Sequence, residues 1–100
     1  MKTLIENGEA VVIILHSPRE KIIGILGEIN ASGVFVRGID LNYFDEWTSA
    51  IRANEPHLPM QDQFFPMWRV ERISKDESAP GLPSMSEQFK QKTGFEMSEI

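Results

Sequence analysis

The residue types that could support catalysis or metal binding are few in this chain and lie far apart. The only histidines are His16 and His57, and cysteine is absent, which excludes disulfides, cysteine-ligated metals and thiol catalysis. A general base needs a partner within hydrogen-bond reach, and a metal site needs converging ligands. Neither histidine has such a partner at a suitable spacing in the sequence. Both are therefore interpreted as structural or surface residues.

Three carboxylates, Asp40, Asp45 and Glu46, cluster where a helix is expected to begin. The positive end of a helix dipole favours acidic residues, which accounts for the cluster without acid–base catalysis or a cation site. Gly24 and Gly27 lie in an expected strand with no helix after them, which argues against a phosphate-binding loop. The sequence therefore predicts no catalytic residue, no metal ion and no cofactor. An enzyme whose residues meet only in the fold is kept as the third alternative.

The most suggestive chemical group is Trp68, Arg69 and Arg72, followed by Lys75. An aromatic ring beside basic side chains can stack on a base and hold a phosphate. The competing interpretation, which we prefer, is that Trp68 fills the end of a barrel. The acidic residues interleaved with this group, which are Glu71, Asp76 and Glu77, also argue against phosphate binding.

Composition and charge limit the classes of partner. The chain has 100 residues, of which 41% are hydrophobic and 25% charged, as expected for a single globular domain. Its net charge is −5, with ten basic residues against fifteen acidic ones. Because proteins that bind phosphate backbones broadly use clustered Lys and Arg, nucleic-acid binding is possible but disfavoured.

The sequence shows no membrane-spanning or secretory segment. Its longest uninterrupted apolar run covers residues 10–15, whereas a helix across a bilayer needs roughly 20 apolar residues. The first nine residues contain one basic residue and several acidic ones, unlike a signal peptide. We therefore expect a cytoplasmic protein that does not bind membranes.

Residues 10–40 contain the strongest fold signal and predict three consecutive strands. Segments 10–16, 21–29 and 34–40 are rich in β-branched residues, with turn signals at 17–20 and 30–33. The first two strands are apolar on both faces. Gly24 and Gly27 inside the second strand allow sharp bending, as at the corner of a barrel.

The pattern changes to helical spacing after residue 41. Phe44, Trp47 and Ile51 form an apolar stripe in a helix expected over 42–54, with Asn42 as its N-cap. This stripe is expected to cover one open end of the barrel. A fourth strand is expected over 61–65.

The rest of the chain predicts one tight turn, a short strand and a tethered helix. Apolar residues three apart in 67–73 indicate a single 3₁₀ turn that leads into a fifth strand. Residues 74–84 are polar and rich in Ser, Pro and Gly, which is typical of an extended linker. The segment 84–93 has an N-cap signal at Ser84 and a helix stop at Gly94.

The order of these elements is similar to the SH3-like small barrels, and most of all to the Sm and Sm-like family. Residues 24–26, Gly-Ile-Leu, look like the Gly-x-Leu of the first Sm motif, and Asn30 stands where that motif carries aspartate. The chain departs from the family at Val34, where an RNA-contacting asparagine is expected. It departs again in 65–69, which lacks the glycine of the second motif. The resemblance covers roughly residues 4–74.

The predicted fold is mainly β: a five-stranded SH3-like, Sm-type small barrel with a helix inserted between strands three and four. The barrel is expected over residues 1–74, a flexible linker over 75–83 and a C-terminal helical tail over 84–100. The leading hypothesis is a non-catalytic interaction module that self-associates as a dimer or ring. It rests on the two apolar faces of the first strands, because large exposed apolar surfaces are rare on monomers.

The alternative hypothesis, implied by the resemblance, is an Sm-like RNA-binding protein. It would use the loop between strands two and three and the connection between strands four and five. The tail is expected to dock through Met85 and Phe89, since an isolated helix of this length is marginal in water. Its linker can reach its own barrel or a neighbouring chain, and we favour the neighbour because Phe95 and Met97 extend the apolar character past Gly94. The residues predicted to contact RNA or a partner are Asn30, Ser32, Gly33, Phe65, Trp68, Arg69 and Arg72.

Overall fold

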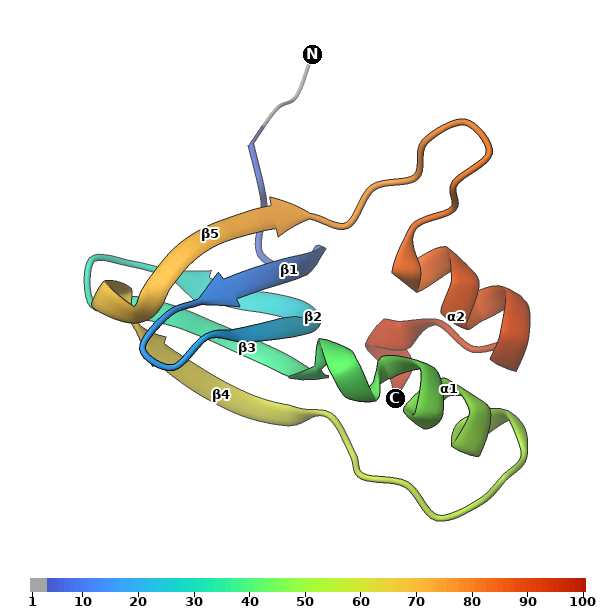
Figure 1. Cartoon of the computed structure of the whole chain (residues 1–100). Coiled ribbons are helices and arrows are strands. Elements are labelled where there is room, and N and C mark those ends of the chain that lie inside the picture. Colours follow the sequence, from blue (N-terminus) through green and yellow to red (C-terminus); the bar gives the residue numbers. More distant parts are fainter. Residues whose placement is uncertain (1–3) are drawn as a thin grey trace.

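The computed structural model describes residues 4–100 and contains a five-stranded antiparallel sheet and two helices (Figure 1). This architecture confirms the mainly-β class, the helix inserted between the third and fourth strands, and the C-terminal helix. The hydrogen-bonded strand order is β4-β3-β2-β1-β5. The strands are β1 (Ala10–Leu15), β2 (Glu20–Ile29), β3 (Gly33–Asp40), β4 (Gln61–Pro66) and β5 (Val70–Lys75).

The sheet curls but does not close into a barrel. Its two edge strands, β4 and β5, are joined only by the 3₁₀ turn η2 (Met67–Arg69), so their linked ends lie close together. Within residues 4–100, β4 and β5 form no ladder with each other. The tight turn predicted from the three-residue spacing is confirmed, and the sheet remains open between its edges.

Close strand packing at two glycines supports the curl. A Cβ atom on Gly24 would lie 2.4 Å from the carbonyl oxygen of Arg37, and one on Gly38 would lie 2.5 Å from that of Ile23. The register of β2 with β3 shifts between Leu26 and Glu28, which places a β-bulge around Gly27. The glycines therefore serve the bending that the sequence predicted.

Apolar side chains form one cluster on each face of the sheet. Because strand residues alternate between faces, Ile22 belongs to an inner cluster and its neighbour Ile23 to an outer one. The buried inner residues are Val11, Ile13, Leu15, Ile22, Leu26, Val34, Val36 and Phe65. The buried outer residues are Ile23, Ile39, Phe44, Trp47, Met60, Phe89 and Met97.

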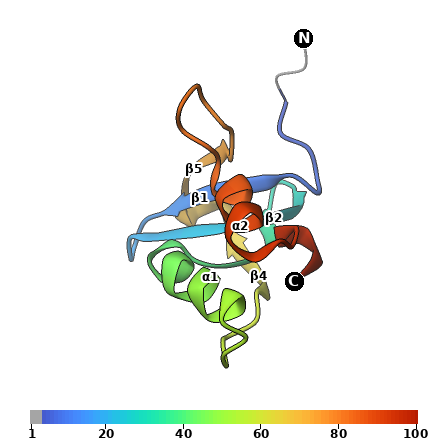
Figure 2. The ribbon, with the colours of Figure 1, turned by 90° about the vertical axis from the view of Figure 1, so that its right-hand side faces the viewer.

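The helices supply the cover for the outer cluster (Figure 2). Helix α1 (Phe44–Arg52) follows the 3₁₀ turn η1 (Leu41–Tyr43), so the α-helix begins two residues later than expected. The N-cap is also different, because the side chain of Asp40 accepts the backbone N–H of Asn42 at 2.8 Å and starts η1. The stripe of Phe44 and Trp47 packs on the outer face of the sheet and on α2.

The C-terminal segment docks on its own chain, which corrects the expectation of docking on a neighbour. It comprises α2 (Met85–Thr93) and the 3₁₀ turn η3 (Met97–Glu99). Phe89 is fully buried and stacks on Trp47 with ring centroids 5.0 Å apart, and Met85 packs at the margin of the same cluster. The apolar outer face of β1 and β2 is therefore largely covered within one chain, because the linker is long enough to bring α2 back.

Hydrogen bonds organise the segment between β5 and α2. The Asp76 carboxylate accepts the backbone N–H groups of Met85 and Ser86 at 2.9 and 2.8 Å, and so caps α2 from a distance in sequence. Ser84 accepts the N–H of Glu87, as its N-cap spacing predicted, and Gly94 ends the helix with φ +82°. The segment thus forms a closed loop against α2, whereas the sequence suggested an extended linker. Residues 1–3 of the predicted barrel lie outside the described residues.

Candidate interaction surface

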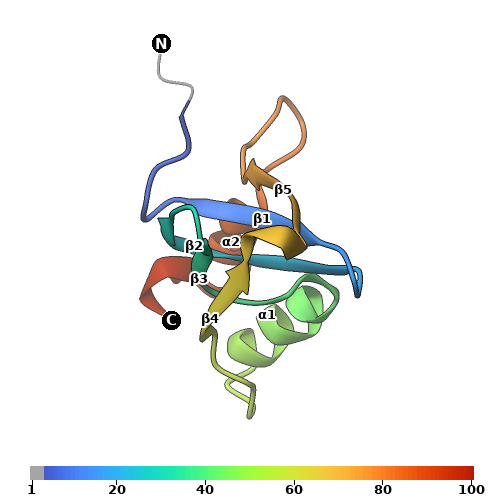
Figure 3. The same cartoon turned by 90° about the vertical axis from the view of Figure 1, so that its left-hand side faces the viewer.

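Three connections lie together at the end of the sheet opposite the helices, which we call the turn end (Figures 1 and 3). They are residues 16–19 between β1 and β2, residues 30–32 between β2 and β3, and η2. The backbone N–H of Met67 donates to the carbonyl of Ser32 at 2.9 Å, and the N–H of His16 donates to the carbonyl of Arg69 at 2.9 Å. The structure thus brings together the two segments that the sequence proposed as one site.

Asn30 and Gly33 have structural roles in the β2–β3 loop. The Asn30 side-chain carbonyl accepts the N–H groups of Ser32 and Gly33, and its amide donates to Glu28 at 2.7 Å. Gly33 lies under β4, where a Cβ atom would come within 2.2 Å of the Phe65 carbonyl oxygen. Of the predicted loop residues, only Ser32 has an exposed side chain that is not used in a hydrogen bond within the described residues.

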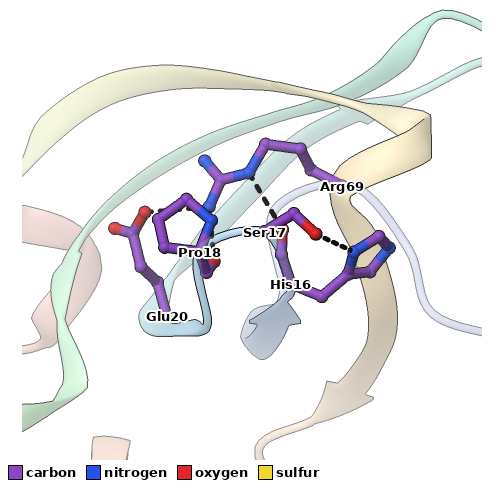
Figure 4. A network of polar contacts seen from close by, with 5 residues as sticks. All are labelled: His16, Ser17, Pro18, Glu20 and Arg69. Carbon is purple, nitrogen blue, oxygen red and sulfur yellow. Dashed lines mark hydrogen bonds and ion pairs between the residues drawn. The ribbon is translucent and has the colours of Figure 1, made fainter.

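Arg69 ties η2 to the β1–β2 turn (Figure 4). Its guanidinium donates to the carbonyls of His16 at 3.2 Å and Pro18 at 2.8 Å, and forms an ion pair of 2.9 Å with Glu20. Only 16% of the Arg69 side chain is exposed. Three of the five guanidinium N–H donors are therefore used inside the protein, which argues against a main role for Arg69 in phosphate contact.

Phe65 also differs from the expectation of a binding role. It is 7% exposed and belongs to the inner cluster, and the Arg69 guanidinium lies over its ring at 6.0 Å from the centroid. Side chains alternate along β4, so Phe65 faces inward and its neighbour Phe64 faces outward. The residue predicted from the sequence, Phe65, is thus the buried one of these two neighbouring phenylalanines.

Trp68 and Arg72, like Ser32, are predicted residues that remain available at the surface. Trp68 is 64% exposed, so the interpretation that it fills the end of a barrel is wrong. Its ring meets that of His16 edge-on with centroids 6.3 Å apart. Arg72 is exposed on β5 next to Glu71, which itself pairs with Arg19 at 3.8 Å. This part of the turn end thus offers one free aromatic face and a mixture of charges.

The structure reveals an exposed aromatic pair that sequence reasoning missed. Phe35 on β3 and Phe64 on β4 are cross-strand partners whose ring centroids lie 4.7 Å apart, and they are 45% and 43% exposed. Both alternate with inner-cluster residues and hence lie on the outer face, beyond the reach of the helices. Together with Gly27 and Val36 they line an open hollow of about 440 Å³. Two further exposed apolar residues, Ile29 and Met67, lie at the same end of the sheet.

The pair lies beside the free edge of the sheet. β4 has β3 on one side, and no strand among residues 4–100 pairs with its other side. The only charged residue of β4 is Asp62, which forms an ion pair with Arg37 across the ladder at 3.3 Å. The opposite edge, β5, is different because it carries Glu71, Arg72 and Lys75. Charges on an edge strand oppose unwanted pairing, and β4 largely lacks this protection.

The described part of the chain shows no concentration of catalytic or ligating groups at this surface. Among residues 4–100, no three His, Asp or Glu side chains converge in an arrangement that could hold a metal ion. Nor does this part contain a helix of the length and apolarity needed to cross a membrane. No protein-family model, curated protein or solved structure matches the chain. The resemblance to the Sm and Sm-like family therefore stays a prediction.

Proposed function

We propose that this protein is a non-catalytic interaction module that self-associates through the outer face and free edge of β4. The observation that carries the proposal is the half-exposed Phe35–Phe64 pair beside an unpaired strand edge. Aromatic side chains contribute most strongly at protein interfaces, because they bury a large area with little loss of conformational freedom. A free edge adds a row of backbone donors and acceptors that a second strand can satisfy.

The helices that cover the rest of the outer face favour β4 as the site of self-association over β1 and β2, which the sequence suggested. β1 and β2 no longer present a large apolar surface, because α1, α2 and η3 pack on it. The remaining exposed aromatic residues of the sheet and its turns are Phe35, Phe64 and Trp68, all near the turn end. Phe35 and Phe64 are therefore the aromatic residues of the outer face that the helices leave available for self-association.

The test is the mass of the protein in solution at tens of micromolar, measured by sedimentation equilibrium. We expect an oligomer for the natural chain and a monomer for Phe64→Lys, because the new charge would be buried in the interface. Phe95→Lys is the matched control, since Phe95 is a similarly exposed phenylalanine in the segment between α2 and η3. A strict monomer of the natural chain at this concentration would overturn the proposal.

RNA binding is a second candidate function, and the exposure of Trp68 is the observation that favours it. A free indole ring with Arg72 on the following strand can stack on a base near a phosphate. The informative variant is Trp68→Ala with Arg72→Gln, because Arg69 holds the turn together and its removal would disturb the fold. Binding of single-stranded RNA at low salt should be lost in this variant and should weaken steeply with salt in the natural chain. No binding by the natural chain at low salt would exclude this function.

A further inference from the structure

We propose that two copies of this chain pair β4 with β4 in antiparallel orientation about a two-fold axis, with Phe64 directly opposite Phe64 of the second copy. This inference rests on the proposed self-association and specifies its partner, strand and register. The occupant of the free edge is a second copy because β4 is complementary to itself in backbone hydrogen bonding and in its outward aromatic side chain. A two-fold interface requires this self-complementarity, since the same surface patch is used twice.

The backbone of β4 directs the N–H and carbonyl groups of alternate residues toward the free edge. Met67 N–H bonds to the Ser32 carbonyl, and Asn30 and Gly33 exchange hydrogen bonds across the β2–β3 turn. Groups in an antiparallel ladder alternate between the two sides of a strand, so Phe65 points its backbone groups at β3. The N–H and carbonyl groups of Asp62 and Phe64 therefore face outward, together with the carbonyl of Pro66.

These outward groups fit a second β4 centred on Phe64. The two Phe64 residues would exchange both of their N–H and carbonyl groups, as a hydrogen-bonded pair does. Asp62 N–H of each copy would then donate to the Pro66 carbonyl of the other. Pro66 lacks an N–H group, so the Asp62 carbonyl of the other copy receives no backbone hydrogen bond from it. The register thus forms four backbone hydrogen bonds.

Side chains select this register over its neighbours. Residues that lie opposite each other on paired strands have their side chains on the same face of the sheet. A two-fold axis between two β4 strands must therefore pass between two copies of the same residue. Near the middle of β4 this residue can be Asp62, Gln63 or Phe64. An axis on Asp62 would set two carboxylates opposite each other, which is destabilising. An axis on Gln63 would set Asp62 against Phe64. An axis on Phe64 extends the existing ring pair into a row of four rings, Phe35–Phe64 followed by the same pair of the second copy.

The polar side chains of β5 disfavour the other available pairing, in which β4 would join β5 of a second copy. Val12 and Ile14 belong to the outer face of β1, and their partners on β5 are Ser74 and Arg72. These polar residues would then lie opposite Phe64 in place of an aromatic ring. In β4 the single charge of Asp62 is offset within each chain by Arg37, so two β4 strands meet with little repulsion.

Disulfide trapping tests the register directly, because the natural chain has no cysteine. Phe64→Cys would place two sulfurs on a pair whose Cα atoms are about 5.5 Å apart, within the range that a disulfide spans. A second variant, Asp62→Cys with Pro66→Cys, keeps Phe64 and sets each new cysteine opposite the other in the partner. Within one chain these two positions are about 13 Å apart along the strand, too far for an internal bridge. Trapping of Gln63→Cys would indicate that the two-fold axis passes between the two copies of Gln63.

Both trapping variants should form covalent dimers under mild oxidation, at least tenfold faster than Gln63→Cys and than the surface control Leu82→Cys. Faster trapping of Gln63→Cys than of the other two would overturn this register. An oligomeric natural chain with no trapping at any β4 position would overturn the two-fold β4 pairing and leave self-association standing. A monomeric natural chain would overturn both. Circular dichroism of each reduced variant checks that it is folded, and the double variant supplies the answer if Phe64→Cys is not.

Discussion

The two ends of the sheet's outer face carry similar apolar residues but differ in how they are covered. At the helix end, Ile23 and Ile39 are buried beneath α1 and α2, and Trp47 stacks on Phe89. At the turn end, the Phe35–Phe64 pair has the same aromatic character but keeps nearly half of its surface exposed. Both helices pack on the helix end, and neither covers the turn end. A second molecule can therefore cover the aromatic pair at the turn end, which the chain itself leaves exposed.

The polar residues of the turn end show the same contrast on a smaller scale. Arg69 has guanidinium partners on two residues of the β1–β2 turn and on Glu20, the first residue of β2, and Asn30 is used within its own loop. Trp68, one residue away, is mostly exposed. Residues that were grouped by proximity in sequence thus divide into those that hold the turns together and those that face solvent.

The largest expected effect comes from comparing one phenylalanine at each end. Phe89→Ala should lower the free energy of unfolding by about 3–5 kcal/mol, because it removes a fully buried ring and leaves a cavity against Trp47. Phe64→Ala should cost well under half of that in the monomer, since the ring is 43% exposed. Urea unfolding at a protein concentration low enough to favour the monomer measures both values.

A larger loss of stability from Phe64→Ala than from Phe89→Ala would contradict the difference in burial between the two ends. If Phe89→Ala left the unfolding midpoint unchanged, α2 would not be part of the folded core in solution. The associated state should respond in the opposite way, with Phe64→Ala weakening assembly and Phe89→Ala leaving the exposed pair intact. Measuring stability and mass on the same two variants therefore separates internal packing from association.

A smaller effect is expected from the two arginines near the turn end. Arg69→Ala should destabilise the protein by about 1–3 kcal/mol, because it removes hydrogen bonds to His16 and Pro18 and the partner of Glu20. Arg72→Ala should change stability by no more than about 0.5 kcal/mol, as is usual for an exposed residue. Thermal unfolding of both variants provides the measurement. Equal values would mean that the Arg69 network contributes little in solution.

Local signals in the sequence predicted most of the elements, because β-branched runs, turn residues and caps act over a few positions. The 3₁₀ turn at 67–69 and the stop at Gly94 were found in this way. The Phe35–Phe64 pair was missed because it depends on the register of β3 with β4, across an inserted helix of unknown geometry. The docking of Phe89 depends equally on a long-range partner, Trp47. Sequence spacing contains no signal for which of two apolar faces the chain itself will cover.

The smallest expected effect concerns how α2 is held near its C-terminal end. Lys90 Nζ lies 2.6 Å from Glu96 Oε1, and this hydrogen bond, with the charge of Glu96, raises the pKa of Lys90 above its usual 10.5. Because the folded-state pKa is raised, the pair's contribution is fully present below about pH 10.5 and is lost as the pH rises through the raised value. The difference in Tm between the natural chain and Lys90→Gln should therefore stay constant below about pH 10.5 and shrink as the pH rises further. Titrating groups elsewhere are common to both proteins and cancel in this difference, and added salt should reduce it because both side chains are exposed. A difference that grows with pH would show that this pair does not secure the covered end.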